Sequence, residues 1–292
     1  MKLIARPLIV LVGALAFPAW SSTFSVSCSS KMEMSRRGCT VKLSGKIEAG
    51  DAARLRAVIR DPLYGDWTYN TLLLDSLGGD VSEALRLAQM VREAMLRTST
   101  ILDTGALAKG SAGARTRSNW PCVSACFLVW VAGTERESYS AVIKAEGEVG
   151  IGLHRPYFSP NTYADSPAKV AELQQAMTTA VQDYLRREHV PERFIEKMLE
   201  SSSRDVYWLR ESGDPFALNG RAPWFEEMMI ARCAWDPAYE REKDQYATNA
   251  FMSKKRLTDD PKYQAYLSWR RSYNACEYEI RRQSQANIQR AK

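Results

Sequence analysis

The sequence contains only two histidines, His154 and His189, so any chemistry that needs an imidazole must use one of them. It lacks a Cys-x-x-Cys pair and any cysteine–histidine grouping at metal-ligand spacing, so we expect neither a metal site nor a cofactor. It also lacks a dense block of lysine and arginine, and its net charge of +6 therefore does not predict nucleic-acid binding. Any chemistry of this chain is therefore expected to use its own side chains, without a metal or a cofactor.

The chain has one long apolar run, which lies at its N-terminus. Lys2 and Arg6 precede apolar residues 8–16, and the polar pair Ser21-Ser22 follows them. This order is typical of a secretory signal peptide, and the run is shorter than the roughly 20 residues of a membrane span. We expect residues 1–22 to be a cleaved signal that directs export to the periplasm or the medium. An uncleaved N-terminal membrane anchor is the alternative.

Export would make the six cysteines candidates for disulfides, because disulfides persist in oxidising compartments. Six cysteines allow fifteen pairings, and the sequence alone does not choose among them. Along the chain they fall into three groups: Cys28 with Cys39, Cys122 with Cys126, and Cys233 with Cys276. Proximity favours the first pair, and the third holds the only two cysteines of the C-terminal part. The middle pair suits disulfide geometry only if Cys122 lies just before a helix begins.

Strand-like and helix-like segments alternate between residues 23 and 220. Alternating apolar residues at 41–47 and the run Leu72-Leu73-Leu74 predict strands. Helices are expected after Asp51, which could cap the first of them, after Asp80, and from Pro167. This alternation predicts an α/β domain with at least partly parallel strands.

Three further segments complete the secondary-structure prediction. Residues 122–131 are apolar nearly all round and predict a buried helix, whereas residues 106–119 predict a loop. The helix that begins at Pro167 is expected to turn Val170, Leu173, Met177, Val181 and Tyr184 inward. Helices around 225–234 and 263–282, in a region rich in tyrosine and tryptophan, predict a helical extension over residues 221–292.

Three polar residues stand at places suited to chemistry. Ser124 lies where a loop enters the apolar segment, although an ordinary helix N-cap would explain it equally well. His154 follows a glycine-rich strand end, whereas His189 lies at a helix exit where it would serve the helix dipole. Asp205 precedes a predicted strand and could accept the imidazole N–H of His154. The three occur in the chain order serine, histidine, aspartate.

These segments resemble motifs of the proteolytic subunit of Clp protease, in the Clp and crotonase superfamily. The residues that carry the resemblance are Leu74-Asp75-Ser76-Leu77-Gly78-Gly79-Asp80, Ser124-Ala125, His154-Arg155-Pro156, Ser203-Arg204-Asp205 and Leu218-Asn219-Gly220. It spans residues 41–220 and is greatest to an exported Clp-like group that carries a Cys-x-Ser-Ala-Cys element. Leu77 stands where that family has a proline.

The resemblance implies a fold and a set of roles. The fold would be a Clp/crotonase-like spiral of ββα units covering residues 23–220. Ser124 would attack a carbonyl, His154 would act as general base and then acid, and Asp205 would orient the imidazole. The backbone N–H groups of Gly79 and Ala125 would form the oxyanion hole. The expected function is that of a serine peptidase-like hydrolase.

The resemblance also bears on partners. A peptide or protein substrate is implied, and assembly into a homo-oligomer stays open. An ATPase partner is not expected, because ATP is absent outside the cytoplasm.

Three other interpretations of the same residues stay open. The chain could be a non-catalytic binding or scaffold protein that retains the fold. It could use a serine–lysine dyad in which Lys144 replaces His154, as in signal-peptide peptidases of the same superfamily. Thiol chemistry at Cys122 and Cys126 is the third, and it requires that these cysteines are not paired.

Overall fold

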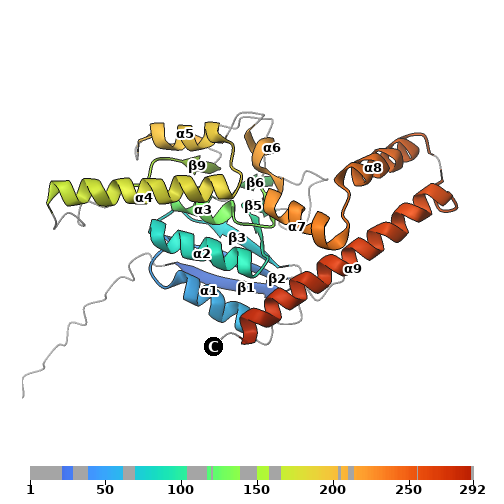
Figure 1. Ribbon diagram of the computed structural model, residues 1–292, viewed down its shortest axis with the longest axis horizontal. Helices are drawn as coiled ribbons and strands as arrows, with labels where there is room; N and C mark the ends of the chain where they lie inside the picture. The colour runs from blue at the N-terminus through green and yellow to red at the C-terminus, as the bar shows by residue number, and fades with distance from the viewer. Residues whose placement is uncertain are drawn as a thin grey trace, which may run out of the picture.

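The computed structural model describes residues 22–28, 39–61, 70–103, 117–119, 121–138, 150–157, 166–202, 205–209, 214–254 and 256–290. Within these ranges the chain forms a mixed α/β region followed by a helical C-terminal region (Figure 1). Residues 1–21 of the predicted signal segment, Lys144 and the pair Ser203-Arg204 lie outside the described residues.

The main sheet has six strands in the order β1-β2-β3-β4-β8-β11. The neighbours from β2 to β8 run parallel, and β1 and β11 pair antiparallel at the two edges, so the predicted partly parallel sheet is confirmed. The bounds of the strands are β1 Thr23–Cys28, β2 Cys39–Ser44, β3 Thr71–Asp75, β4 Arg97–Ser99, β8 Glu135–Glu137 and β11 Gly220–Arg221.

A second sheet has three strands in the order β10-β9-β7, and a two-stranded ribbon joins β5 to β6. An isolated parallel bridge between Ser76 and Cys122 connects the end of β3 to the second sheet. The bounds are β5 Ile101–Asp103, β6 Arg117–Asn119, β7 Cys122–Val123, β9 Ile151–Leu153 and β10 Tyr207–Trp208. Residues 117–119, which we expected to belong to a loop, pair with β5 instead.

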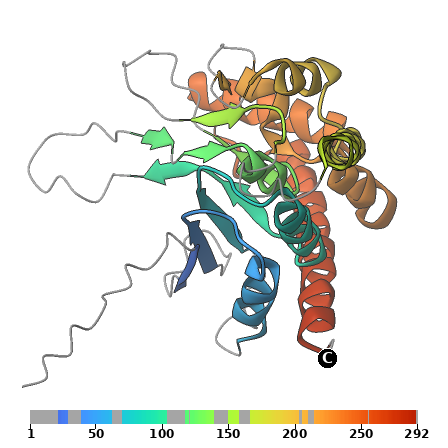
Figure 2. The same cartoon turned by 90° about the vertical axis from the view of Figure 1, so that its left-hand side faces the viewer.

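Six helices belong to the α/β region: α1 Asp51–Arg60, α2 Val81–Glu93, α3 Ala125–Trp130, α4 Pro167–Arg187, α5 Glu192–Glu200 and α6 Asp214–Leu218. Asp80 caps α2 by accepting the N–H of Glu83 at 2.6 Å. Asp51 was expected to cap helix α1, but it is the first residue of the helix, and the N-cap position is occupied by Gly50, at a φ of 97°. In Figure 2 the strands lie toward the left, and helices α1, α2 and α9 lie toward the right.

The core of this region is mainly aliphatic. Alternate residues of β2 and β3 are buried, as strand periodicity requires, and they pack with α1, α2 and the wholly buried α3. The prediction for α4 is only partly correct. Val181 and Tyr184 are buried, but Leu173 is 44% exposed. The N-terminal half of α4 extends beyond the sheet in Figure 1, so its apolar residues have little core to pack against.

The apolar stretch 122–131 is not one helix. Cys122 and Val123 form strand β7, Ser124 makes a turn, and helix α3 then runs from Ala125 to Trp130. Apolarity on all sides is equally compatible with a buried strand and a buried helix, so periodicity could not separate the two. The break places Cys122 before the helix, which is the condition for its disulfide.

All six cysteines are paired as the sequence favoured: Cys28–Cys39, Cys122–Cys126 and Cys233–Cys276. The last disulfide joins α7 to α9 in the C-terminal region. The helices of this region are α7 Pro223–Cys233, α8 Pro237–Met252 and α9 Pro261–Arg290. Helix α8 was not predicted from the sequence. Among the described residues, no helix combines the length and apolarity that a membrane crossing needs.

Candidate functional site

Ser124 and His154 each follow the last residue of a neighbouring strand. Strands β7 and β9 run parallel, with Val123 opposite Gly152, so both residues lie at the carboxyl edge of the same sheet. The backbone N–H of Ser124 donates to the carbonyl of Gly152 at 2.9 Å. The carboxyl edge of a parallel sheet is the usual place for binding and catalysis in open α/β folds.

The backbone of Ser124 adopts a conformation that non-glycine residues rarely take. Its φ is 59° and its ψ is −124°. A serine on a tight strand-to-helix turn with positive φ is the geometry that exposes a nucleophile in other hydrolase folds. Ser124 occupies the N-cap position of α3, but its side chain makes no capping hydrogen bond, and the residue is partly exposed. The hydroxyl is therefore not used to cap the helix, as an ordinary N-cap serine would be.

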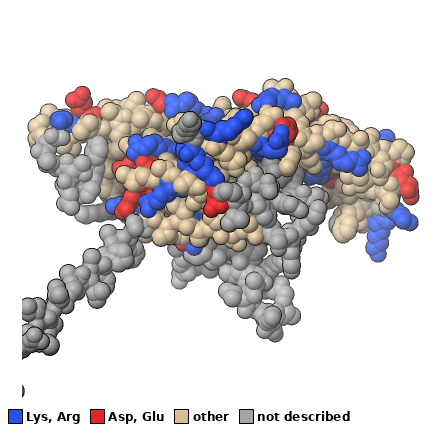
Figure 3. Space-filling view, turned by 90° about the horizontal axis from the view of Figure 1, so that it is seen from below, with Lys and Arg blue, Asp and Glu red and all other residues tan. Residues whose placement is uncertain are grey.

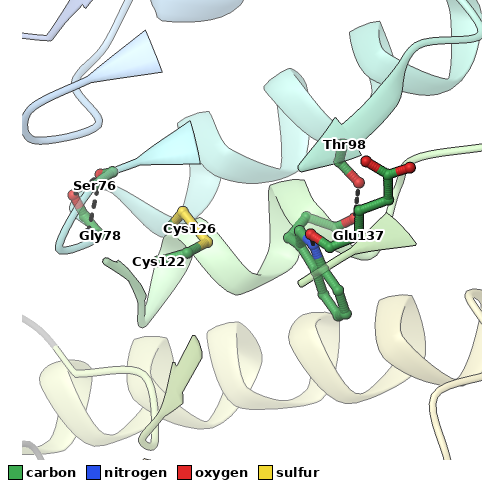
Figure 4. Close-up of a disulfide and its surroundings, with 7 residues drawn as sticks. Ser76, Gly78, Thr98, Cys122, Cys126 and Glu137 are labelled. Atoms are coloured by element: carbon green, nitrogen blue, oxygen red, sulfur yellow. Dashed lines mark hydrogen bonds between the residues drawn. A yellow bond between two sulfur atoms is a disulfide. The ribbon is translucent and has the colours of Figure 1, made fainter. Parts of the chain in front are cut away.

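The turn at Ser124 is anchored on both sides. The disulfide between Cys122 and Cys126 ties the end of β7 to the first turn of α3, with Cα atoms 5.2 Å apart (Figure 4). At the other end of α3, the carbonyl of Trp130 accepts the hydroxyl of Thr98 at 2.6 Å, and its indole N–H donates to the carbonyl of Glu137 at 3.3 Å. The disulfide and these two hydrogen bonds thus fix both ends of the short helix. The strained residue, Ser124, lies just before the helix, inside the loop that the disulfide closes.

Gly78 packs directly against this turn. A Cβ placed on Gly78 would lie 2.7 Å from the Cβ of Ser124 and 3.0 Å from the backbone nitrogen of Ala125. Its φ of 95° also favours glycine. The hydroxyl of Ser76 accepts the N–H of Gly78 at 3.1 Å and holds this approach (Figure 4).

Two backbone N–H groups, on the residues that follow Gly78 and Ser124, form no hydrogen bond within the described chain. Gly79 continues the glycine turn, and its neighbours fix it to Ile47, since the carbonyl of Gly78 accepts from Ile47 and the N–H of Asp80 donates back to it. Ala125 is the first residue of α3. Neither Gly79 nor Ala125 donates its N–H to another residue of the described chain. A pair of N–H groups beside a serine is what an oxyanion hole requires.

The ring of His154 is buried and already oriented. Its Nδ1 lies 3.0 Å from the carbonyl oxygen of Arg155. Because a carbonyl can only accept, Nδ1 carries the proton in this arrangement, and Nε2 is left as the acceptor that a general base needs. The ring of Tyr157 lies 5.5 Å from the imidazole, between ring centres.

Asp205 lies at the same edge but makes a different contact. Strand β10 pairs antiparallel with β9, with Tyr207 opposite Leu153, and extending that register sets Asp205 across from Arg155. Its carboxylate accepts the hydroxyl of Ser202 at 2.8 Å, and the residue is exposed. The hydrogen bonds within the described ranges do not join Asp205 to His154.

The described residues offer neither a metal-binding cluster nor a free thiol. It holds no group of three or more histidine, cysteine or acidic side chains that could bind a metal ion. All six cysteines are oxidised, so the alternative of thiol chemistry at Cys122 and Cys126 would first require reduction.

Sequence reasoning missed the contacts that backbone atoms make. The carbonyl of Arg155 has no sequence signature, because every residue carries one. The packing of Gly78 on Ser124 was also missed, although the glycine pair was noted. Leu77 and Tyr157, two exposed apolar side chains next to the glycine turn and to His154, become visible only once the strands are arranged.

Comparison with known proteins does not assign the chain to a family. No family model matches it, and no curated protein matches it. Among solved structures it is similar to a mutant of the 1510-N membrane-bound stomatin-specific protease, with 11% identity, a TM-score of 0.37, and coverage of 67% of this chain and 83% of that one. A likeness at this level is too distant to indicate an activity.

Proposed function

We propose that the protein is an exported serine hydrolase of the peptidase type that works without ATP. The observation that carries the proposal is the backbone of Ser124. A strained serine with an uncapped hydroxyl follows one strand, and His154 follows its parallel neighbour. Strained backbone of this kind persists where the surrounding structure enforces it, and such positions cluster at active sites.

The proposed reaction uses four groups of the chain. Ser124 Oγ attacks the substrate carbonyl and passes its proton to Nε2 of His154. The N–H groups of Gly79 and Ala125 stabilise the oxyanion that forms. His154 then gives its proton to the leaving group, and a water molecule activated by the same ring hydrolyses the acyl-enzyme.

The third member of the triad has two candidates. Asp205 is the residue that the resemblance assigns, and the strand register sets it near this edge. In the structure, however, the carbonyl of Arg155 already fixes the proton of His154 on Nδ1. We therefore propose that this carbonyl orients the imidazole of the free protein, and that Asp205 contributes only if its carboxylate leaves Ser202.

The remaining expectations extend this proposal. We propose a Clp/crotonase-like spiral for residues 23–220, export by cleavage of residues 1–22, a helical extension over residues 221–292, and a peptide or protein substrate. Leu77 and Tyr157 would contact an apolar side chain of that substrate. A non-catalytic scaffold is the competing function, and it predicts no reactive serine.

Covalent labelling with a fluorophosphonate tests the proposal. The folded protein at neutral pH should be labelled, and Ser124→Ala should abolish the signal. Ser272→Ala is the matched control, because Ser272 is an exposed serine of α9 and its loss should leave labelling unchanged. Absence of labelling in the folded wild-type protein would instead favour the scaffold.

A further inference from the structure

The end of the α8–α9 hairpin displays two large apolar side chains to solvent. Phe251 and Met252, the last residues of α8, are 81% and 75% exposed. Helices α8 and α9 run together and project from the α/β region, so residues 251–262, here called the arm tip, lie far from the main core (Figure 1).

The arm tip is a braced structure. The N–H and hydroxyl of Ser253 both donate to the carbonyl of Asn249, at 3.0 and 2.7 Å, and close the end of α8. Asp260 opens α9 by accepting the N–H groups of Lys262 and Tyr263. The hydroxyl of Tyr246 donates to Asp260 at 2.5 Å and ties α8 to that cap. The apolar pair is therefore held outward on a fixed scaffold.

Phe251 and Met252 are not required for the packing between helices α8 and α9. Tyr239, Tyr266 and Trp269 pack on one another between α8 and α9, with ring centres 5.1 to 6.2 Å apart. This aromatic packing already joins the two helices. Exposed phenylalanine and methionine at adjacent positions then serve no evident purpose inside the protein, and paired exposed apolar residues are typical of interaction sites.

Positively charged residues follow the apolar pair closely in the sequence. Between residues 251 and 262 the sequence has four lysines and arginines and two aspartates, and one of the aspartates is the Asp260 cap. Lys254, Arg256 and Lys262 are exposed, and none of them forms an ion pair within the described chain. In Figure 3 blue side chains protrude at the right-hand end of the molecule, where Figure 1 shows the arm.

We propose that the arm tip docks onto an anionic lipid bilayer. Two side chains of about 150–250 Å² each fall well short of the roughly 800 Å² per partner of a standard protein interface. The same two side chains suit the boundary between headgroups and acyl chains, where apolar residues insert while lysine and arginine contact anionic lipids. The proposal does not depend on the activity proposed for Ser124.

Co-sedimentation with vesicles tests the docking. The exported chain, which lacks residues 1–22, is mixed with vesicles of phosphatidylglycerol and phosphatidylcholine, or of phosphatidylcholine alone. We expect binding to the anionic vesicles that weakens as salt is added. The double variant Phe251→Ser/Met252→Ser should bind at least about tenfold more weakly, given the apolar area removed. The triple variant Lys254→Gln/Arg256→Gln/Lys262→Gln should lose the preference for anionic lipid.

Matched controls separate the tip from the rest of the chain. Ile230→Ser changes an equally apolar, half-exposed residue of α7, and it should bind as the wild type does. Ser124→Ala should bind vesicles normally, which makes failure of the docking distinguishable from failure of the proposed chemistry.

Three results would overturn the docking proposal. They are a wild-type chain that stays in the supernatant with anionic vesicles, a Phe251→Ser/Met252→Ser variant that binds them undiminished, and a tip-dependent dimer in sedimentation velocity without vesicle binding. The last result would assign the tip to a second copy of the chain.

Discussion

The α/β region and the C-terminal helices are held together by different chemistry. The core of the α/β region is built mainly from aliphatic side chains on regularly spaced strand and helix positions. The C-terminal cluster is largely aromatic and includes Phe225, Trp235 and Tyr273. Beside that cluster lies a fully buried ion pair, in which Arg281 donates to Glu277 at 2.9 Å. The first region is specified by local periodicity, and the second by contacts between distant segments.

This contrast suggests that the α/β region carries the proposed chemistry and that the C-terminal helices stabilise it. The groups proposed for chemistry all lie at strand ends of the α/β region, and backbone atoms hold most of them. The C-terminal helices instead brace that region from outside. Arg281, for example, donates to the carbonyl of Met95 and to Thr134. Variants of the side chains proposed to react, Ser124 and His154, should then change labelling with little change in stability, and variants in the C-terminal region should do the opposite.

The largest expected effect is on the rate of labelling. His154→Gln should lower the rate of fluorophosphonate labelling by about 10²–10⁴, the usual contribution of general acid–base catalysis. Its free energy of unfolding should change little. Labelling that survives in this variant would support the alternative base Lys144.

Asp205→Asn is the companion measurement. If the carbonyl of Arg155 orients the imidazole, this variant should slow labelling less than about tenfold, because removing Asp205 leaves the tautomer of His154 in place. A loss as large as that of His154→Gln would show that Asp205 is the orienting residue.

The buried ion pair should dominate stability in the C-terminal region. Glu277→Gln leaves the charge of Arg281 buried without its partner, and we expect a loss of about 3–5 kcal/mol in the free energy of unfolding. Urea denaturation measures it. The fraction that stays folded should label as fast as the wild type. Slower labelling of that fraction would show that the C-terminal region also affects the proposed chemistry.

The same pair predicts a dependence on pH. Burial raises the pKa of Glu277 and is the largest single influence, but the charge of Arg281, hydrogen bonds from Tyr273 and Arg281, and the charge of Arg221 together outweigh it, so that pKa lies below its ordinary value. Its contribution to stability is therefore present above the unfolded pKa of about 4.3 and lost as pH falls below it. Wild-type stability should fall more steeply in that acid range than the stability of Glu277→Gln, and equal slopes would contradict the assignment.

Two of the three disulfides, Cys122–Cys126 and Cys233–Cys276, can be compared in the same way. The loop that Cys233–Cys276 closes is far longer than the loop of Cys122–Cys126, so loop entropy predicts losses of about 4 and about 2 kcal/mol when each pair is replaced by alanine. Labelling should respond in the reverse order, because the shorter loop holds Ser124. Equal labelling of both double variants would show that the disulfide does not position the serine.

The last comparison concerns two glycines with nearly the same backbone. Gly50 and Gly78 have φ values of 97° and 95°, but a Cβ at Gly50 meets nothing within 4 Å, whereas one at Gly78 meets Ser124. Gly50→Ala should cost only the strain of the left-handed backbone, about 1–2 kcal/mol. Gly78→Ala should add about 1–3 kcal/mol of overpacking and should also slow labelling. Equal costs would mean that the contact with Ser124 is unimportant.

Sequence patterns predicted much of the fold and less of the site. Strand β3 and helices α1, α2 and α4 carry clear periodicity or capping residues, and spacing favoured the three disulfide pairs without choosing among the fifteen pairings. The split of residues 122–131 into strand, turn and helix did not, since an apolar segment has no periodicity to read. Helix α8 was missed because tertiary packing of its aromatic face, rather than a strong local pattern, stabilises it.

In the site, the side chains were easier to predict than their contacts. Ser124, His154 and Asp205 are candidates named from the sequence, and the strand register places them at one edge, although the hydrogen bonds of the described residues do not join any two of them. The hydrogen bond of His154 to the carbonyl of Arg155 could not be predicted, because it depends on how the chain turns after β9. The partner of Asp205, Ser202, is likewise set by the turn before β10.

Mapping the site of covalent modification tests the central claim most directly. The folded wild-type protein is treated with a fluorophosphonate at neutral pH, digested and examined by mass spectrometry. The account predicts a single adduct on Ser124, and no adduct when the protein is first unfolded. An adduct on another residue, or an unmodified Ser124 in folded protein, would contradict it.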